Sequence, residues 1–226
     1  IDLTNAYAMV VNGGKKIKPK LIQSIFDRRG KLIFSTEEKK CINCIQKGDA
    51  IEYDLPLIEE KKEFVIDNRI AYQMTSMLEG VVLRGTGKKI FELDIPLAGK
   101  TGTTNENKDA WFIGFSPDLV VGVYVGYDYP KSLGYKETGS KVAVPIFKEF
   151  MSQALLEKNK IPFRVPSGIS FVKIDPRTGL QTFNKNGIME PYILGTEPFN
   201  QNFLVLDSLG SVITDTLSGT GSLFIN

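Results

Sequence analysis

The clearest chemical signal in the sequence is the segment formed by Lys100, Thr101, Gly102, Thr103 and Thr104. A ligand that ends in a carboxylate needs a cation and hydroxyl donors to orient it. If its acyl group is transferred, it also needs backbone N–H groups for the oxyanion. Lys100 supplies the cation, and Thr101 and Thr103 supply the hydroxyls. These side chains therefore predict a site that binds a carboxylate-bearing ligand.

This segment ends a strand that we predict at residues 96–103. Side chains alternate along a strand, so Lys100 and Gly102 face one way and Thr101 and Thr103 the other. One ligand must then lie along the strand's edge, where an extended peptide gains main-chain hydrogen bonds and Gly102 permits its close approach. Lys-Thr-Gly alone arises by chance in roughly one chain of this length in twenty. The competing interpretation is a solvated strand end.

The composition excludes several other chemistries. The absence of histidine removes Ser-His-Asp and Cys-His arrangements and His-ligated zinc sites. A net charge of +2 is far from the basic excess of a nucleic-acid surface. Cys41 and Cys44 are spaced C-x-x-C but have no two further N or S ligands, so we interpret them as a loop staple or inert thiols, with redox catalysis as the alternative. We expect no metal, no cofactor and no nucleic-acid partner.

The first part of the chain is predicted to contain a helix and a hairpin. Apolar residues at positions 3, 6, 7 and 10 have helical spacing and stop at an Asn-Gly-Gly sequence typical of a helix end. The β-rich segments 21–26 and 32–34 flank a turn and predict a hairpin. Residues 35–65 are dense in Lys and Glu and predict an exposed excursion.

The central part predicts helices packed on a sheet. A helix should begin after Asp67. Its apolar stripe comprises Ile70, Met74, Met77, Leu78, Val81 and Val82, and we interpret the two methionines as core residues. Further strands are predicted at 110–115 and 119–127 as an antiparallel hairpin, followed by an amphipathic helix at 144–156 that should cover one sheet face. We interpret Trp111, Tyr124 and Tyr127 as packing residues. A mainly antiparallel sheet covered by helices is an α+β fold.

The last part of the chain has a different composition. Proline and glycine in residues 159–168 give the best boundary signal, and strands are predicted at 169–175, 203–206 and 212–214. We therefore divide the chain into residues 1–160, which carry the candidate site, and residues 161–226, a C-terminal β-rich extension. The chain begins with Ile1 and shows no signal peptide, so we expect it to be a piece of something longer.

Several blocks, in this order, resemble the back half of the transpeptidase domain of a class A penicillin-binding protein. They are residues 78–86 (LEGVVLRGT), 98–104 (AGKTGTT), 109–114 (DAWFIG), 123–128 (VYVGYD) and 145–150 (PIFKEF). The resemblance covers most of residues 1–180 and fades after that. It implies the C-terminal portion of a serine β-lactamase/D,D-transpeptidase-like fold.

The resemblance implies roles for the residues of the Lys-Thr-Gly segment. Lys100 and Thr103 would be catalytic, with the Thr103 backbone N–H as one of two oxyanion donors. Substrate would contact the whole segment from Lys100 to Thr104. The implied reaction is peptidoglycan cross-linking by acyl transfer between stem peptides that end in D-Ala-D-Ala, with acylation by penicillin as a side reaction.

The family's nucleophile is the serine of Ser-x-x-Lys, which should precede Lys-Thr-Gly together with Ser-x-Asn. Ser-x-Asn does not occur in the sequence, and Ser-x-x-Lys occurs once, at Ser170 to Lys173. That stretch has a strand pattern, which sends Ser170 and Lys173 to opposite faces, whereas a helix would put them on one face. We therefore expect that Ser170 is not the nucleophile and that these residues alone are inactive.

The resemblance also implies a setting for the parent protein. It would be a bifunctional cell-wall synthase with a glycosyltransferase domain, facing the periplasm or extracytoplasmic side of a bacterial inner membrane. Its N-terminal anchor would lie outside this chain, which itself should not contact the membrane. The implied partners are peptidoglycan stem peptides, β-lactam antibiotics and the missing N-terminal half of the same domain.

Three alternatives stay open from the sequence. A D,D-carboxypeptidase or a serine β-lactamase shares the Lys-Thr-Gly tripeptide. A non-catalytic module that senses β-lactams or binds peptidoglycan could keep the segment after losing its serine. A scaffold for partner synthases could keep it too. The residues upstream of Ile1 would discriminate, because only the enzymes need Ser-x-x-Lys there.

Overall fold

The computed structural model describes residues 1–36, 63–155 and 160–198 in full, and the backbone of four short strands outside these ranges. The chain forms two compact units, residues 1–168 and 169–226. No helix in the described ranges is long and apolar enough to span a bilayer. The candidate site lies in the first unit.

The first unit is built on a three-stranded antiparallel sheet. Its strands are β5 (Ala98–Thr103), β6 (Asp109–Phe115) and β7 (Val120–Gly126), in the order β5-β6-β7. The β5–β6 register runs from Ala98 opposite Phe115 to Thr103 opposite Ala110. Within the described residues β5 is therefore an edge strand, and the predicted α+β class with a mainly antiparallel sheet is confirmed.

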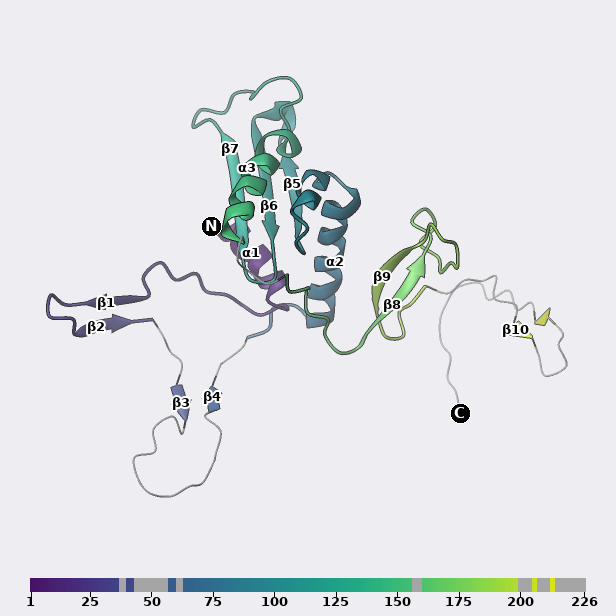
Figure 1. Ribbon diagram of the computed structural model, residues 1–226, viewed down its shortest axis with the longest axis horizontal. Helices are drawn as coiled ribbons and strands as arrows, with labels where there is room; N and C mark the ends of the chain where they lie inside the picture. The colour runs from purple at the N-terminus through teal and green to yellow at the C-terminus, as the bar shows by residue number, and fades with distance from the viewer. Residues whose placement is uncertain are drawn as a thin grey trace, which may run out of the picture. The chain divides into compact units, whose positions relative to one another are not determined.

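The helix α3 (Gly139–Ala154) covers one face of this sheet, as Figure 1 shows. Phe112 of β6 and Phe147 of α3 are fully buried and meet edge to face, with ring centroids 4.8 Å apart. Val123 and Met151 belong to the same buried cluster. The 3₁₀ helix η1 (Lys88–Leu93) contributes the buried Ile90 to this cluster.

The opposite face is covered at one end by α1 (Asp2–Val11) and α2 (Asn68–Arg84). There Phe115 packs against Tyr7 of α1, with ring centroids 6.4 Å apart, and against Phe163, with centroids 5.7 Å apart. Ala98, at the start of β5, is buried in this cluster. The core therefore holds the start of β5 from both sides and leaves its end near the surface.

Helix α2 begins as predicted, but only part of its predicted apolar stripe faces inward: Val82 is buried and Leu78 packs against the core. The Asp67 carboxylate caps it by accepting a 2.8 Å hydrogen bond from the Arg69 backbone N–H. The buried positions are mainly small ones, Ala71, Thr75, Gly80 and Val82. Met74 and Met77 are 42% and 61% exposed, so the prediction that they are core residues is wrong. Small side chains let α2 approach β5 closely, which turns the methionines outward.

Two hairpins occupy the segment between α1 and α2. Strands β1 (Ser24–Phe26) and β2 (Leu32–Ser35) pair around a turn in which Gly30 has φ of 79°. The predicted hairpin is thus confirmed. Strands β3 (Lys40–Ile42) and β4 (Leu57–Glu59) pair within the predicted excursion. The Cys41 side chain and all of Cys44 lie outside the described residues.

The second unit contains two antiparallel pairs. Strands β8 (Ile169–Ile174) and β9 (Ile188–Ile193) form one, and β10 (Val205–Leu206) and β11 (Val212–Ile213) form the other. The sequence pattern predicts strands at the positions of β8, β10 and β11 but not at that of β9. Pro191 interrupts the strand pattern there, and proline is tolerated because, among the described strands, β9 pairs only with β8.

Candidate active site

The Lys-Thr-Gly segment forms the end of edge strand β5. Ala98 and Gly99 are buried, and Lys100 is the first exposed residue of the strand. The segment therefore passes from the core to the surface at Lys100. Such a strand end combines a firmly held backbone with side chains that a ligand can reach.

The structure places Lys100 and Gly102 on one face of β5 and Thr101 and Thr103 on the other, as alternation requires. A Cβ added to Gly102 would lie 3.1 Å from the Cβ of Trp111, which is its partner in the β5–β6 register. The hydroxyl of Thr103 is on the α3 face, where its Oγ1 accepts a 3.0 Å hydrogen bond from the Gly139 N–H.

Lys100 and Thr101 nevertheless meet at the edge of the strand. The Lys100 ammonium donates a 3.1 Å hydrogen bond to the Thr101 carbonyl and lies 3.5 Å from Thr101 Oγ1. A cation and a hydroxyl group thus converge on one side of the chain although their side chains leave opposite faces. Together they can bind an anionic oxygen that approaches the edge.

Two residues for which the sequence predicts no role, Thr86 and Ser140, hold Thr101 through a chain of hydrogen bonds. The hydroxyl of Thr86, in the turn after α2, lies 3.0 Å from Thr101 Oγ1. Ser140, in the first turn of α3, donates a 2.9 Å hydrogen bond from its Oγ to the Thr86 carbonyl. These partners lie 15 and 54 residues apart along the chain, so no local pattern could have revealed them.

Thr104 takes part in a different network, just beyond the strand. Its Oγ1 accepts a 2.8 Å hydrogen bond from the Asp109 N–H and donates one of 3.2 Å to Asp109 Oδ2. Asp109 Oδ1 accepts a 2.8 Å hydrogen bond from the Tyr124 hydroxyl, which raises the pKa of Tyr124. The network fixes the connection from β5 to β6, which includes the 3₁₀ turn η2 (Asn105–Asn107).

Aromatic side chains lie beside the segment on the Lys100 face. Trp111 is half-buried, and its ring packs on that of Tyr124 with centroids 4.6 Å apart. Tyr124 thus packs on its neighbour in the sheet, as predicted, although Tyr124 and Tyr127 are 49% and 45% exposed. The Lys131 ammonium lies 4.1 Å from the centre of the Tyr127 ring. The face beside Lys100 is thus partly aromatic and open.

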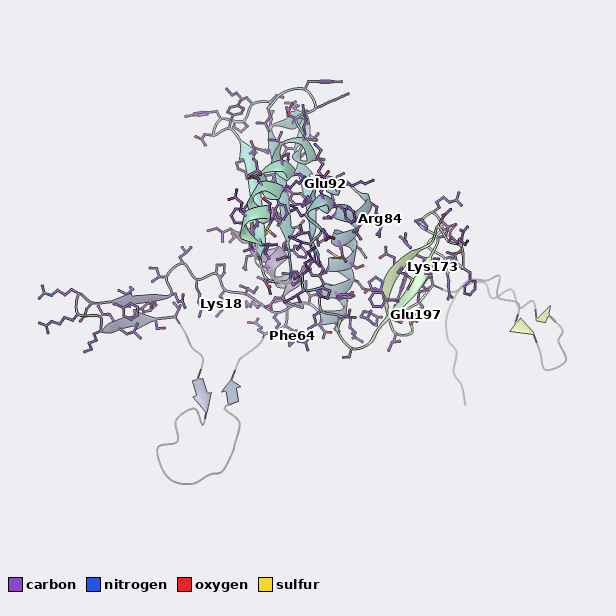
Figure 2. All side chains as sticks on the ribbon, viewed as in Figure 1. Lys18, Phe64, Arg84, Glu92, Lys173 and Glu197 are labelled. Carbon is purple, nitrogen blue, oxygen red and sulfur yellow. The ribbon has the colours of Figure 1, made fainter. Side chains whose placement is uncertain are left out.

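Ser170 lies in the second unit, on strand β8. Its register partner is Tyr192, whereas that of Lys173 is Met189. Ser170 donates a 2.5 Å hydrogen bond to the carboxylate of Glu197, which Figure 2 labels together with Lys173. An odd spacing on a strand separates Ser170 from Lys173, so Lys173 cannot take the Ser170 proton in this conformation.

Residues 1–152 match the family described as the penicillin binding protein transpeptidase domain. The chain belongs to this family. Over 180 residues it is 45% identical to penicillin-binding protein 1A of Rickettsia conorii, covering 78% of this chain and 22% of that protein. Over 208 residues it is 35% identical to penicillin-binding protein 1A of Pseudomonas aeruginosa, covering 79% of this chain and 25% of the relative. The resemblance found in the sequence is confirmed.

Solved structures in this family have the same fold. The structure of penicillin-binding protein 1A from Haemophilus influenzae matches 87% of this chain and 32% of its own, with a TM-score of 0.72 and 33% identity. PonA1 from Mycobacterium tuberculosis, solved in complex with penicillin V, matches 74% of this chain and 40% of its own, with a TM-score of 0.54 and 25% identity. The chain spans 22% to 26% of the length of three Rickettsia relatives.

Proposed function

We propose that this chain supplies the substrate-positioning wall of a D-Ala-D-Ala transpeptidase active site. The observation that carries the proposal is the convergence of the Lys100 ammonium and the Thr101 hydroxyl on the exposed edge of β5, in a chain of the penicillin-binding transpeptidase family. A stem peptide would lie along this edge as an added strand, with its terminal carboxylate at Lys100 and Thr101. Gly102 offers no side chain to obstruct it.

The reaction would be acyl transfer through a serine ester. A serine outside these 226 residues attacks the carbonyl of the penultimate D-Ala, the lysine of its Ser-x-x-Lys motif takes the hydroxyl proton, and the Thr103 backbone N–H helps to hold the oxyanion. Terminal D-Ala leaves, and the amine of a second stem peptide then resolves the ester. The Lys100 charge stabilises the negative charge that develops during attack.

The setting of this reaction is also part of the proposal. The parent would be a membrane-anchored synthase on the extracytoplasmic face of a bacterial inner membrane, with a glycosyltransferase domain as well. Its relatives bear the name penicillin-binding protein 1A, and one structural neighbour was solved with penicillin V. Residues 1–160 would belong to the transpeptidase domain, and residues 161–226 would form its C-terminal extension.

The test is an assay of the parent protein with two substrates. Fluorescent penicillin should label it covalently, and a peptide ending in D-Ala-D-Ala should compete with that labelling. With an acceptor amine present, D-Ala release should be accompanied by the cross-linked product, whereas release by hydrolysis alone would identify a D,D-carboxypeptidase. Failure of both labelling and D-Ala release in a folded parent would overturn the enzymatic proposal in favour of a sensor or scaffold.

A further inference from the structure

Thr86 lies in the turn between α2 and η1, and its side chain contacts Thr101 of the candidate site. It stands between Gly85 and Gly87, where α2 gives way to η1, and its Oγ1 lies 3.0 Å from Thr101 Oγ1. The turn comes from a different element than β5, so this contact joins the Lys-Thr-Gly strand to the end of α2. Thr86 is itself exposed, and its hydroxyl is therefore not a core group that simply needed a partner.

The backbone of this turn is held on several sides. The N–H groups of Gly85 and Gly87 donate to the Val81 carbonyl at 3.1 and 3.0 Å. A Cβ added to Gly85 would lie 2.9 Å from that carbonyl oxygen, so only glycine fits there without a shift. Ser140 donates to the Thr86 carbonyl from α3. The backbone at Thr86 is thus held by both α2 and α3.

The hydrogen-bond direction between the two hydroxyls decides what Thr101 can offer a ligand. A hydroxyl group has one hydrogen to donate and two lone pairs to accept with. Lys100 can only donate, and its ammonium already approaches Thr101 Oγ1. If Thr86 also donates to Thr101 Oγ1, both acceptor positions of Thr101 are used. The hydrogen of Thr101 is then left to point away from both neighbours, at the open strand edge.

We propose that Thr86 is a positioning residue, whose hydroxyl donates to Thr101 Oγ1 and thereby directs the Thr101 hydrogen at the substrate carboxylate. The inference rests on the proposed function, because it needs a carboxylate bound at Lys100 and Thr101. Thr86 does not touch the ligand. It acts by restricting the rotation of the Thr101 hydroxyl, so its effect should depend on whether the ligand has a carboxylate to receive that hydrogen.

The experiment compares one β-lactam with the methyl ester of its carboxylate, using the parent protein. Thr86→Val keeps the side-chain shape but loses the hydroxyl, and it should slow acylation by the free acid about three- to tenfold, the effect of one neutral hydrogen bond. Acylation by the ester should change by less than about twofold, since the ester does not present the same anionic acceptor. Thr86→Ser keeps the hydroxyl and should restore most of the free-acid rate.

A double-mutant comparison tests whether Thr86 acts through Thr101. Thr86→Val should add almost nothing in a Thr101→Val background, because the group that it positions is then absent. Thr178→Val, in a turn of the second unit, is the matched control and should leave both rates unchanged. Thermal unfolding of every variant checks that it is folded.

The possible outcomes separate this inference from the proposed function. Equal slowing with acid and ester, or no recovery in Thr86→Ser, would show a merely structural role and overturn the inference. If Thr101→Val slows acylation by the free acid and Thr86→Val does not, the inference fails while the carboxylate site stands. If neither Lys100→Ala nor Thr101→Val affects acylation, the proposed carboxylate site itself fails.

Discussion

The backbone N–H of Gly139, the first residue of α3, donates a 3.0 Å hydrogen bond to Oγ1 of Thr103 at the end of β5. The contact is close because Gly139 has no side chain. A Cβ at this position would lie 2.4 Å from the Trp111 carbonyl oxygen and 2.5 Å from that of Gly102. The start of α3 is therefore seated directly on the backbone of the two strands that form the candidate site.

Replacing Gly139 with alanine should disturb this close packing of α3 on the strands. The added methyl group must push the first turn of α3 away from β5 and β6, at a cost of roughly 1–3 kcal/mol of stability. The Thr103 hydrogen bond would lengthen, so we expect slower acylation of the parent by a β-lactam together with a lower unfolding temperature. Both are measured on the same preparation.

Gln153→Ala is the control for the same helix. Gln153 is exposed near the end of α3, where a surface substitution changes stability by no more than about 0.5 kcal/mol. Its acylation rate should equal that of the wild type. If Gly139→Ala behaved like Gln153→Ala in both measurements, the close seating of α3 on the strands would be wrong.

A second prediction concerns the core between α3 and the sheet. Phe147 is fully buried against Phe112, whereas Phe150 of the same helix is 50% exposed. Phe147→Ala should lower the free energy of unfolding by about 3–5 kcal/mol, because it leaves a cavity in the core. Phe150→Ala should cost much less in denaturant unfolding. Similar losses for the two variants would contradict the packing described here.

A third prediction uses the pH dependence of the α2 cap. Hydrogen bonds from the Arg69 side chain and backbone N–H hold the pKa of Asp67 well below its ordinary value of 3.8. The ionised carboxylate therefore stabilises the folded state above that pH, and the contribution is lost as the pH falls below it. Asp67→Ala should lower the unfolding temperature at pH 7, and its difference from wild type should shrink as the pH drops towards 3.

Asp67→Asn separates the cap from the ion pair. Asparagine keeps a side-chain oxygen that accepts from the Arg69 N–H, so it should be more stable than Asp67→Ala at pH 7. Its own stability relative to Asp67→Ala should not depend on pH. A gap between wild type and Asp67→Ala that stayed constant from pH 7 to pH 3 would mean that the carboxylate charge does not contribute.

The main elements could be predicted from the sequence because they follow local periodicity. The sheet strands and the Asp67 cap appear close to where the pattern predicts them. The start of α3 does not. The apolar spacing predicts a start at residue 144, but the helix begins at Gly139. Its extra turn rests on contacts with Gly102 and Trp111, which are distant in the sequence.

The candidate site could also be predicted only in part: the faces of its strand follow from the sequence, but its side-chain contacts do not. Strand alternation placed Lys100 and Thr101 on opposite faces, and the structure agrees. The return of the Lys100 ammonium to the Thr101 carbonyl depends on a side-chain conformation that a two-residue period does not determine. Thr86 and Gly139 contact the segment through tertiary packing. Nothing in the residues around them in the sequence predicts these contacts.

A fourth prediction addresses the single Ser-x-x-Lys of the chain. Ser170→Ala in the parent should leave penicillin labelling unchanged, because Ser170 donates its hydrogen bond to Glu197 and the strand keeps Lys173 on the opposite face. Gel fluorescence after labelling with a fluorescent penicillin measures this. Loss of the label in a folded Ser170→Ala protein would make Ser170 the nucleophile and contradict its assignment here.

The last prediction concerns Lys100, whose ammonium we place at the substrate carboxylate. Lys100→Ala should slow acylation of the parent by a β-lactam on the order of 10²–10³-fold, by analogy with loss of one oxyanion donor. Lys100→Arg should also be slow, because a planar, bulkier guanidinium cannot occupy the space of a compact ammonium beside Gly102. Lys31→Ala, at the exposed hairpin turn, is the control and should react at the wild-type rate. Equal second-order rate constants for wild type and Lys100→Ala, with equal unfolding temperatures, would reduce Lys-Thr-Gly to a solvated strand end.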